Sequence, residues 1–293
     1  MNQQFQEQTQ KTIQEKGIEN LKQALDKKEK IIVLLAPSFI TEWEYPEIIY
    51  KLKACGFDKI VELTFGAKVV NKEYHKIISS KKQLWIATVC PGIVENIKTQ
   101  FPKYKKNLIP IDSPMIATAK ICKKYYPKHK TLFISPCYYK KIESSQYKEV
   151  DFCIDYQELN KLFEEKLKGK KIKKTSAGFD KFYNDYTKIY PLAGGLSKTA
   201  HLKDIIKPGE EKIIGGWAEV SEFLKNPDKK IKFLDINFCV GSCIGGPAIT
   251  DKDLKRKKEK VMAYLALAAK EKITKGHKGI MKKAEGISFK RKF

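Results

Sequence analysis

Short apolar runs and longer amphipathic stretches alternate along most of the chain. After a helical pattern at 19–28, the run at 31–36 is continuously apolar and stops at Pro37 and Ser38, as expected for a strand buried on both faces of a parallel sheet. Further strands are predicted at 59–64, 84–89, 108–111, 132–135, 152–155, 213–216 and 233–237. Helical patterns lie between them at 44–55, 68–79, 93–100, 115–124, 156–167 and 218–224. This alternation predicts an α/β fold.

The eight predicted strands fall into two groups of four. We therefore expect two lobes, each with a four-stranded, mostly parallel sheet flanked by helices. The expected divisions are an N-terminal helical extension at 1–24, a first lobe at 25–128, a second lobe at 129–238 and a final segment at 239–293. That final segment contains a glycine-rich loop, a charged amphipathic helix at 251–275 and a tail, GISFKRKF, which is expected to pack on the surface.

Composition places the chain among folded proteins. Its hydrophobic content of 42% argues against intrinsic disorder. No apolar run approaches the roughly 18 residues of a membrane-spanning helix, and the first residues lack the apolar middle of a secretory signal. We expect a cytoplasmic protein without membrane attachment.

The charge balance is strongly basic, with 58 Lys and Arg against 34 Asp and Glu. Such an excess can mark a nucleic-acid-binding protein. Only Arg256 and Arg291 are arginines, however, and no recognition-helix pattern accompanies the lysines. The composition therefore argues against nucleic-acid binding and favours a lysine-rich surface that suits acidic protein partners.

Seven cysteines are present, and an odd number without an export signal argues against structural disulfides. Four of them follow predicted strands: Cys90, Cys137, Cys239 and Cys243. In open α/β sheets, ligands collect at the carboxyl ends of the strands, so we expect these four cysteines to share a site. The other three are interpreted as buried packing residues: Cys55, Cys122 and Cys153.

Residue types alone leave three interpretations of the four cysteines open, namely an iron–sulfur cluster, a zinc site and unrelated thiols. Structural zinc sites commonly use C-x2-C pairs, whereas this set contains one C-x3-C pair and two single cysteines. Glycines at 241, 245 and 246 let backbone amides approach an anionic centre closely. The pattern favours iron–sulfur over zinc.

A series of short motifs, in this order, resembles the catalytic domain of the di-iron (FeFe) hydrogenases. The series is TVCPG at 88–92, SP at 113–114, SPCYYKKIE at 135–143, GG at 194–195 and CVGSCIGG at 239–246. The resemblance implies reversible reduction of protons to dihydrogen at an H-cluster in the cleft between the two lobes. This cofactor is a 4Fe-4S cubane joined through a cysteine sulfur to a di-iron unit with carbon monoxide, cyanide and a bridging dithiolate amine.

The resemblance also implies roles for individual residues. Cys90, Cys137, Cys239 and Cys243 would bind the cubane, and Cys243 would bridge to the di-iron unit. Lys140 matches a lysine that hydrogen-bonds a cyanide ligand.

Two further sets of residues match the family pattern. Glu143 matches an acidic residue that ties the lobes together and, with Lys140, is expected to serve catalysis. Small and polar residues that surround the cyanides correspond to Pro37, Ser38, Ser113, Gly194 and Gly195.

The departures from the family concern proton supply. Ordinary members carry a proton-donating cysteine immediately before the first ligand, and this chain has Val89 there. Two glutamates and a serine of the usual relay correspond to Tyr74, Ile77 and Ile109. Hydrogen turnover needs a proton acceptor within reach, so slow turnover is expected. The alternatives are a dihydrogen-sensing or redox protein with little turnover, and an assembly-type relative that binds only a cubane.

Residues expected near the di-iron unit also differ. Two methionines of the family become Ser135 and Asn237, and a glutamine becomes Met115. The ferredoxin-like C-x2-C-x2-C-x3-C-P run of large members does not occur in the sequence. The expected partners are therefore an acidic ferredoxin or similar electron carrier, together with hydrogenase maturation proteins, in an anaerobic cytoplasm.

Overall fold

The computed structural model describes residues 3–80, 83–174, 178–183, 186–271 and 274–293. The helices are α1 (Gln3–Glu15), α2 (Ile18–Asp26), α3 (Glu47–Ala54), α4 (Thr64–Ser80), α5 (Pro91–Gln100), α6 (Pro114–Tyr125), α7 (Tyr139–Ser145), α8 (Tyr156–Leu167), α9 (Gly195–Thr199), α10 (Trp217–Lys225) and α11 (Leu254–Lys270). The strands are β1 (Ile31–Leu35), β2 (Lys59–Glu62), β3 (Trp85–Ile86), β4 (Lys130–Ser135), β5 (Phe152–Asp155), β6 (Glu211–Gly215) and β7 (Phe233–Asn237).

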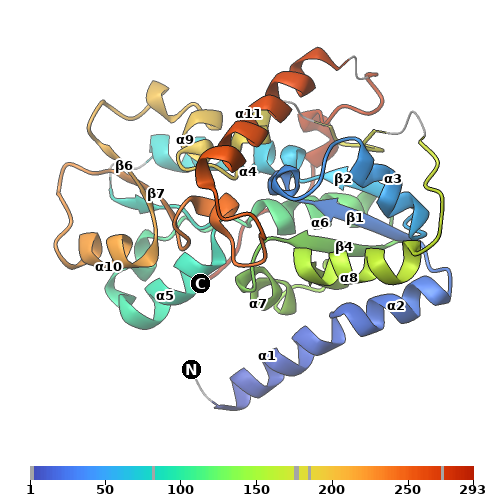
Figure 1. The fold of residues 1–293 in the computed structure, drawn as a ribbon. Coiled ribbons are helices and arrows are strands. Elements are labelled where there is room, and N and C mark those ends of the chain that lie inside the picture. Colours follow the sequence, from blue (N-terminus) through green and yellow to red (C-terminus); the bar gives the residue numbers. More distant parts are fainter. Residues whose placement is uncertain (1–2, 81–82, 175–177, 184–185, 272–273) are drawn as a thin grey trace.

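Within the described residues, the strands form two sheets with helices packed around them (Figure 1). One sheet has the order β2-β1-β4-β5 and the other has the order β3-β7-β6. All of these strand pairs are parallel. The predicted α/β class, with parallel sheets flanked by helices, is confirmed.

The predicted strand at 108–111 is reduced to isolated bridges. Leu108 pairs with Ile86 beside β3, and Ile111 pairs with Lys290. Pro110 lies between these two bridges and has no N–H to donate to a ladder. In the part of the chain that the structure describes, the second sheet therefore has three strands and a single bridge where a fourth strand was expected.

The strands are not grouped in their order along the chain. β1 and β2 share a sheet with β4 and β5, whereas β3 pairs with β7. Each sheet thus combines strands from both expected lobe ranges. The fully apolar β1 lies inside its sheet between β2 and β4, where both of its edges are hydrogen-bonded and both of its faces are covered.

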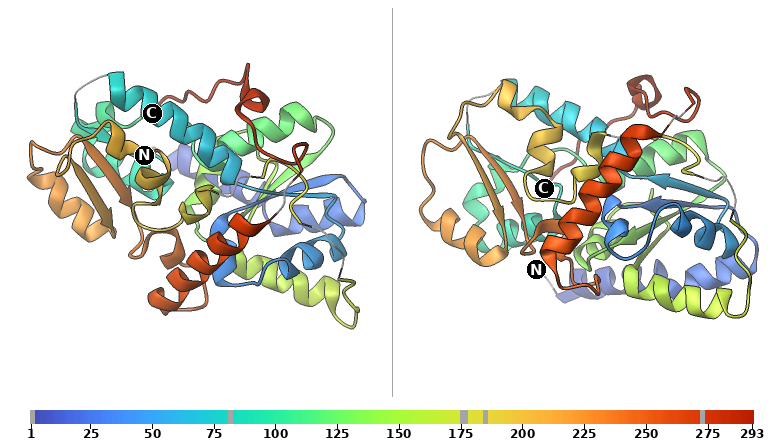
Figure 2. Two further views of the ribbon diagram at one scale, coloured as in Figure 1. Left: turned by 90° about the horizontal axis from the view of Figure 1, so that it is seen from above. Right: turned by 45° about the horizontal axis from the view of Figure 1, so that its top comes forward.

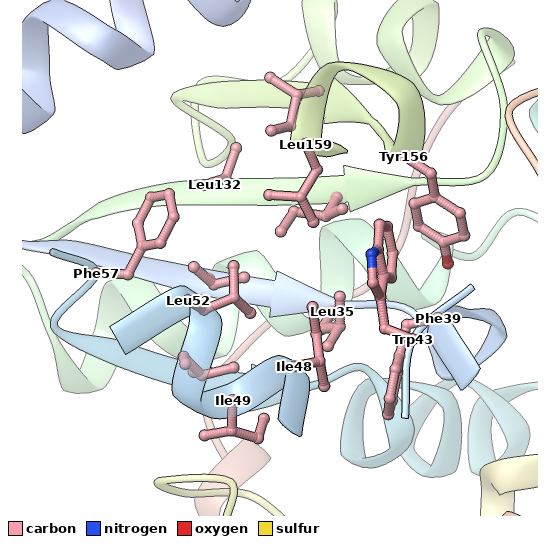
Figure 3. Close-up of a cluster of buried hydrophobic side chains, with 14 of the residues drawn as sticks. Leu35, Phe39, Trp43, Ile48, Ile49, Leu52, Phe57, Leu132, Tyr156 and Leu159 are labelled. Atoms are coloured by element: carbon pink, nitrogen blue, oxygen red, sulfur yellow. The ribbon is translucent and has the colours of Figure 1, made fainter. Parts of the chain in front are cut away.

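The continuous apolar run of β1 serves two cores. Ile31, Val33 and Leu35 face one buried cluster, whereas Ile32 and Leu34 face another on the opposite side of the sheet. Figure 3 shows the first cluster, in which side chains of β1 and β4 pack against helices α3 and α8. The aromatic side chains Phe39 and Trp43 belong to the same cluster. Its labelled members are Leu35, Phe39, Trp43, Ile48, Ile49, Leu52, Phe57, Leu132, Tyr156 and Leu159.

The two ends of the chain pack against the sheets. The expected N-terminal extension is helical, and α1 lies against α7 while α2 lies against β5. The expected helix at 251–275 is α11, which ends at Lys270; residues 272–273 lie outside the described residues. α11 lies along one side of the molecule (Figure 2) and packs against the 3-10 turns Pro37–Thr41, Tyr186–Ile189 and Ser242–Gly245. Within the described part of the chain, none of the helices combines the length and the apolar character that a membrane-spanning segment requires.

The C-terminal tail was expected on the surface, and this expectation is wrong for two of its side chains. Phe289 is buried in a core cluster and the Arg291 side chain is only 6% exposed. Backbone hydrogen bonds run from Asp112 N to Phe289 O (2.8 Å) and from Arg291 N to Pro110 O (3.1 Å). The tail thus pairs with residues 110–112, a long-range contact that local sequence patterns cannot reveal.

Candidate metal centre

Four cysteines reach one cavity from three loops at the carboxyl ends of strands. Cys90 follows β3 and precedes α5, whereas Cys137 lies between β4 and α7. Cys239 and Cys243 follow β7, and Cys243 belongs to a short 3-10 turn, Ser242–Gly245. All four line the same cavity. β3 and β7 are neighbours in one sheet and β4 belongs to the other, so loops from both sheets contribute to the cavity wall.

The cavity has a volume of about 100 Å³. A single water position takes about 10–15 Å³ on this measure, so the space corresponds to roughly seven to ten waters. Apart from the thiols and Lys140, much of its wall is apolar and includes Met115, Phe133 and Leu196. Its size and lining suit a group much larger than one ion.

Desolvation disfavours the ionised form of three of the four thiols, Cys137, Cys239 and Cys243, although Cys243 as a whole residue is exposed. Desolvation raises the pKa of Cys137 to about 11 and the pKa of Cys239 to about 12, and it also raises the pKa of Cys243. Neighbouring thiols, including Cys90, add to each of these shifts because clustered thiolates repel one another. A bound metal centre supplies the positive charge that makes coordinating thiolates stable in such surroundings.

Backbone amides are directed at two of the thiols. Tyr139 and Lys140 donate backbone hydrogen bonds to Cys137, and the Phe238 amide donates to Cys90 Sγ at 3.5 Å. Ser135 Oγ accepts from the Cys137 amide at 3.0 Å and so holds the loop in a compact turn. Such donors stabilise thiolate ligands and tune an anionic cluster.

The size of the cavity bears on the choice between a single metal ion and a cluster. Among the described residues, no group of three or more His, Cys, Asp or Glu side chains could hold a single metal ion. A cubane is larger than one ion, so its ligands stand farther apart. The four thiols line a cavity of about 100 Å³, and this size favours a cluster of several irons over a single zinc ion.

Two glycines after Cys243 hold the ligand loops together at close range. A Cβ on Gly245 would lie 1.7 Å from Val240 O, inside the C-x3-C loop. A Cβ on Gly246 would lie 2.5 Å from Pro136 O, in the loop that carries Cys137. Only glycine permits these approaches, so Gly246 brings ligand loops of both sheets into contact.

Of the described residues that line the cavity, Lys140 is the only one with a cationic side chain, and it forms an ion pair with Glu143. Its Nζ donates to Glu143 Oε2 (2.6 Å) and to Val89 O (3.2 Å). Glu143 is 4% exposed and also accepts hydrogen bonds from Ser113 Oγ (3.0 Å) and Arg291 (2.7 Å). Burial alone would raise the pKa of Glu143, but Lys140 and Arg291 together hold it below its ordinary value.

Comparison with known proteins identifies the family. The profile of the family described as "Iron only hydrogenase large subunit, C-terminal domain" matches residues 29–247. The chain belongs to this family. The matched residues include the four cysteines that line the cavity.

One curated protein is similar in sequence, and two solved structures are similar in fold. Iron hydrogenase 1 of Clostridium pasteurianum is 24% identical over an alignment 270 residues long, gaps included, and the alignment takes in 72% of this chain and 47% of that protein. The chain thus spans about half the length of this relative. A variant of the FeFe hydrogenase HydA1 from Chlamydomonas reinhardtii has the same fold, with a TM-score of 0.63 at 14% identity over 89% of this chain and 90% of that one. A structure concerned with stepwise H-cluster assembly has a TM-score of 0.62 at 15% identity, covering 90% and 91% of the two chains.

The structure separates the other predicted site residues of this chain into two sets. Pro37 and Ser38 line the cavity, and Ser38 Oγ is hydrogen-bonded to Tyr156 Oη at 2.6 Å. The remainder do not line the cavity: Ser113, Glu143, Gly194 and Gly195. Ser113 and Glu143 bond to each other behind Lys140, whereas Gly194 adopts φ +71° at the start of α9.

The residues that replace the family's relay and di-iron contacts are also placed. Val89, Met115 and Asn237 line the cavity, and none of these three side chains is a titratable group. Tyr74 is fully buried, and its hydroxyl is hydrogen-bonded to Thr88 Oγ1 at 2.8 Å. Ile109 is fully buried.

Two residues at the site were given no role from the sequence. Asp235 lines the cavity, accepts hydrogen bonds from Ser197 N (3.1 Å) and Ser197 Oγ (2.8 Å), and has its pKa raised to about 6 by burial. Arg291 reaches Glu143 from the C-terminal tail. The sequence did offer one indication that Arg291 has a particular role, because arginine occurs only twice in this lysine-rich chain.

Proposed function

We propose that this protein binds an H-cluster in the cavity and catalyses the reversible reduction of protons to dihydrogen, with electrons from a separate acidic ferredoxin. The observation that carries the proposal is the cavity itself, because Cys90, Cys137, Cys239, Cys243 and Lys140 all line it. Family membership supports the same chemistry. Because the chain covers only 47% of the curated relative, the activity of that whole protein is a proposal for this one.

The residues divide the work between holding the cofactor and shaping its surroundings. The four thiolates would hold the cubane, with Cys243 as the bridge to the di-iron unit, and Lys140 would donate a hydrogen bond to an anionic ligand. Apolar side chains such as Met115 and Phe133 limit water access and lower the local dielectric. When bound, the H-cluster supplies the chemistry that combines two protons with two electrons.

The partners follow from charge and from the cofactor. A formal net charge of +24 favours an acidic electron carrier such as a ferredoxin, by complementarity of the two surfaces. Hydrogenase maturation proteins would supply the di-iron unit. An anaerobic cytoplasm is the compartment we propose for such a protein.

A dihydrogen-responsive protein with little turnover is the second candidate. Val89 supports it, because this cavity-lining side chain carries no exchangeable proton at the position where the family has a proton-donating cysteine. The fully buried Ile109 is likewise unable to relay a proton. Both candidates require the same cofactor and differ in the rate of proton delivery.

Infrared spectroscopy tests the cofactor. The chain is reconstituted with iron and sulfide under anaerobic conditions and then matured with a synthetic di-iron complex. We expect carbon monoxide and cyanide bands in the wild type and no such bands in Cys137→Ser, with Cys55→Ala as the control because Cys55 does not line the cavity. A reconstituted cubane without these bands indicates the cubane-only assembly type, and failure to retain any iron contradicts all three cluster-based functions.

Dihydrogen evolution from reduced viologen then separates the first two candidates. Turnover by fully loaded protein supports the enzyme. Bands that respond to dihydrogen without measurable turnover support the sensor.

A further inference from the structure

The C-terminal tail delivers a guanidinium group to the back of the cavity wall. Residues 289–291 are fixed by backbone hydrogen bonds with residues 110–112, and Phe289 is 7% exposed. Lys120 Nζ also donates to Ser288 O at 3.1 Å. The Arg291 side chain therefore extends from an anchored backbone, and it lies outside residues 29–247, which match the family profile.

Arg291 contacts the two segments that precede and follow cavity-lining cysteines. One terminal nitrogen donates to Glu143 Oε1 at 2.7 Å, in helix α7 after Cys137. The other donates to Thr88 O at 3.2 Å, two residues before Cys90. One planar group thus joins a segment of the three-stranded sheet to a helix that follows the four-stranded sheet.

Lys140 spans the same two segments from the cavity side. Its Nζ donates to Val89 O and to Glu143 Oε2. Lys140 and Arg291 therefore bind different oxygens of the Glu143 carboxylate. Glu143 is buried, and an unpaired buried carboxylate would be costly. Within the described residues, Arg291 is the only one of the three partners of Glu143, with Lys140 and Ser113, that bonds to Oε1, so it holds the side of the carboxylate opposite to Lys140.

We propose that Arg291 is a positioning residue for the candidate cluster site, which fixes the Cys90 segment against α7 and aligns Lys140 with the cavity through Glu143. The role in aligning Lys140 toward a bound ligand rests on the proposed function, whereas the bracing of the two segments does not. A guanidinium suits this role because it is planar and presents several donors in fixed directions. Lysine keeps the charge but cannot reproduce this fixed two-sided geometry.

The bracing is tested on the cluster-free chain by amide hydrogen exchange with mass spectrometry. In Arg291→Gln we expect exchange to rise by about 10- to 100-fold in residues 88–92 and 139–145, the range implied by loss of a hydrogen bond to a charged group. Arg256→Gln is the matched control, because Arg256 is the other arginine and its side chain is 62% exposed on Asp251. Unchanged exchange in both segments of Arg291→Gln would overturn the proposal.

A second readout concerns Lys140 in matured protein. At equal cluster content, the cyanide bands of Arg291→Gln are expected to shift in the same direction as those of Lys140→Met, with a smaller shift in Arg291→Lys. Bands identical to the wild type in Arg291→Gln would overturn the positioning of Lys140. If the wild type binds no cluster, the proposed function fails, and the exchange experiment still decides whether Arg291 braces the two segments.

Loss of folding is separated from loss of positioning by Arg291→Lys, which retains the charge beside Glu143. If Arg291→Gln does not fold, both readouts are taken from Arg291→Lys. Wild-type exchange and wild-type bands in that variant would contradict a need for the guanidinium geometry.

Discussion

Asp235 shows how burial of one carboxyl group links stability to pH. Its side chain receives two hydrogen bonds from Ser197, and no ion pair reaches it within the described residues. Burial raises its pKa to about 6, whereas an aspartate in an unfolded chain ionises near pH 3.9, roughly. The folded state holds the proton more tightly, so stability that is fully present below about pH 4 is lost as the pH rises through 6.

Replacing Asp235 by asparagine removes this dependence and keeps an oxygen that can accept from Ser197. We expect the stability advantage of Asp235→Asn over the wild type to widen by about 1 kcal/mol between pH 5 and pH 7.5. Urea unfolding at the two pH values measures the difference. Asp112, whose pKa is also raised to about 6 by burial, is present in both proteins, so its contribution to the pH dependence cancels in the comparison. If the two proteins differ by the same unfolding free energy at both pH values, the raised pKa of Asp235 is refuted.

A substitution at Val89 can show whether proton delivery limits turnover. Because its side chain lines the cavity, Val89→Cys places a thiol where the family has its proton donor. In matured protein we expect dihydrogen evolution to rise by on order of 100-fold, the lower range for general acid–base catalysis. Val89→Ala is the size control and should not gain activity. An equal rate in both variants would show that another step limits turnover.

At the scale of elements, the C-x3-C loop depends on glycine. A Cβ on Gly245 would lie 1.7 Å from the Val240 carbonyl oxygen, so the backbone must shift to admit alanine. We expect Gly245→Ala to lose about 1–3 kcal/mol of unfolding free energy and to retain less iron after reconstitution. Gly276→Ala is the control, because a Cβ there meets nothing within 4 Å. Equal iron content in the two variants would argue against a tight loop.

Local patterns predicted the individual elements well where the physical signals are local. The helix predicted at 156–167 is α8 (Tyr156–Leu167), whose start is fixed by a capping box between Asp155 and Glu158. The strand predicted at 31–36 is β1, because its continuous apolar run has to be buried on both faces. Pro110 shortened the strand predicted at 108–111, and weighing it as a ladder breaker would have improved that prediction.

At the scale of the whole molecule, a buried ion pair joins distant segments. Lys188 donates to Glu62 of β2 and to Tyr264 of α11 (2.8 Å), and both charged side chains are fully buried. Removing one partner leaves an uncompensated buried charge, so we expect Lys188→Met to cost about 3–5 kcal/mol of unfolding free energy. The double variant with Glu62→Leu should recover much of that loss. Additive losses in urea unfolding would contradict this coupling.

The pairing of segments that lie far apart in the chain could not be predicted from the sequence. The position of four cysteines after predicted strands correctly indicated one shared cavity, because parallel strands end at a common edge. The pairing of β1 with β4 and of β3 with β7 depends on contacts between segments far apart in the chain. The same holds for Arg291, whose partner Glu143 is 148 residues away.

The interleaving of the two sheets has a consequence for biosynthesis. β3 finds its sheet partner β7 only after residue 237 has left the ribosome, and the last cavity-lining cysteine, Cys243, emerges later still. A nascent chain that contains only the first half of the sequence therefore lacks one wall of the cavity. We expect iron to be loaded after translation, once the finished polypeptide has folded.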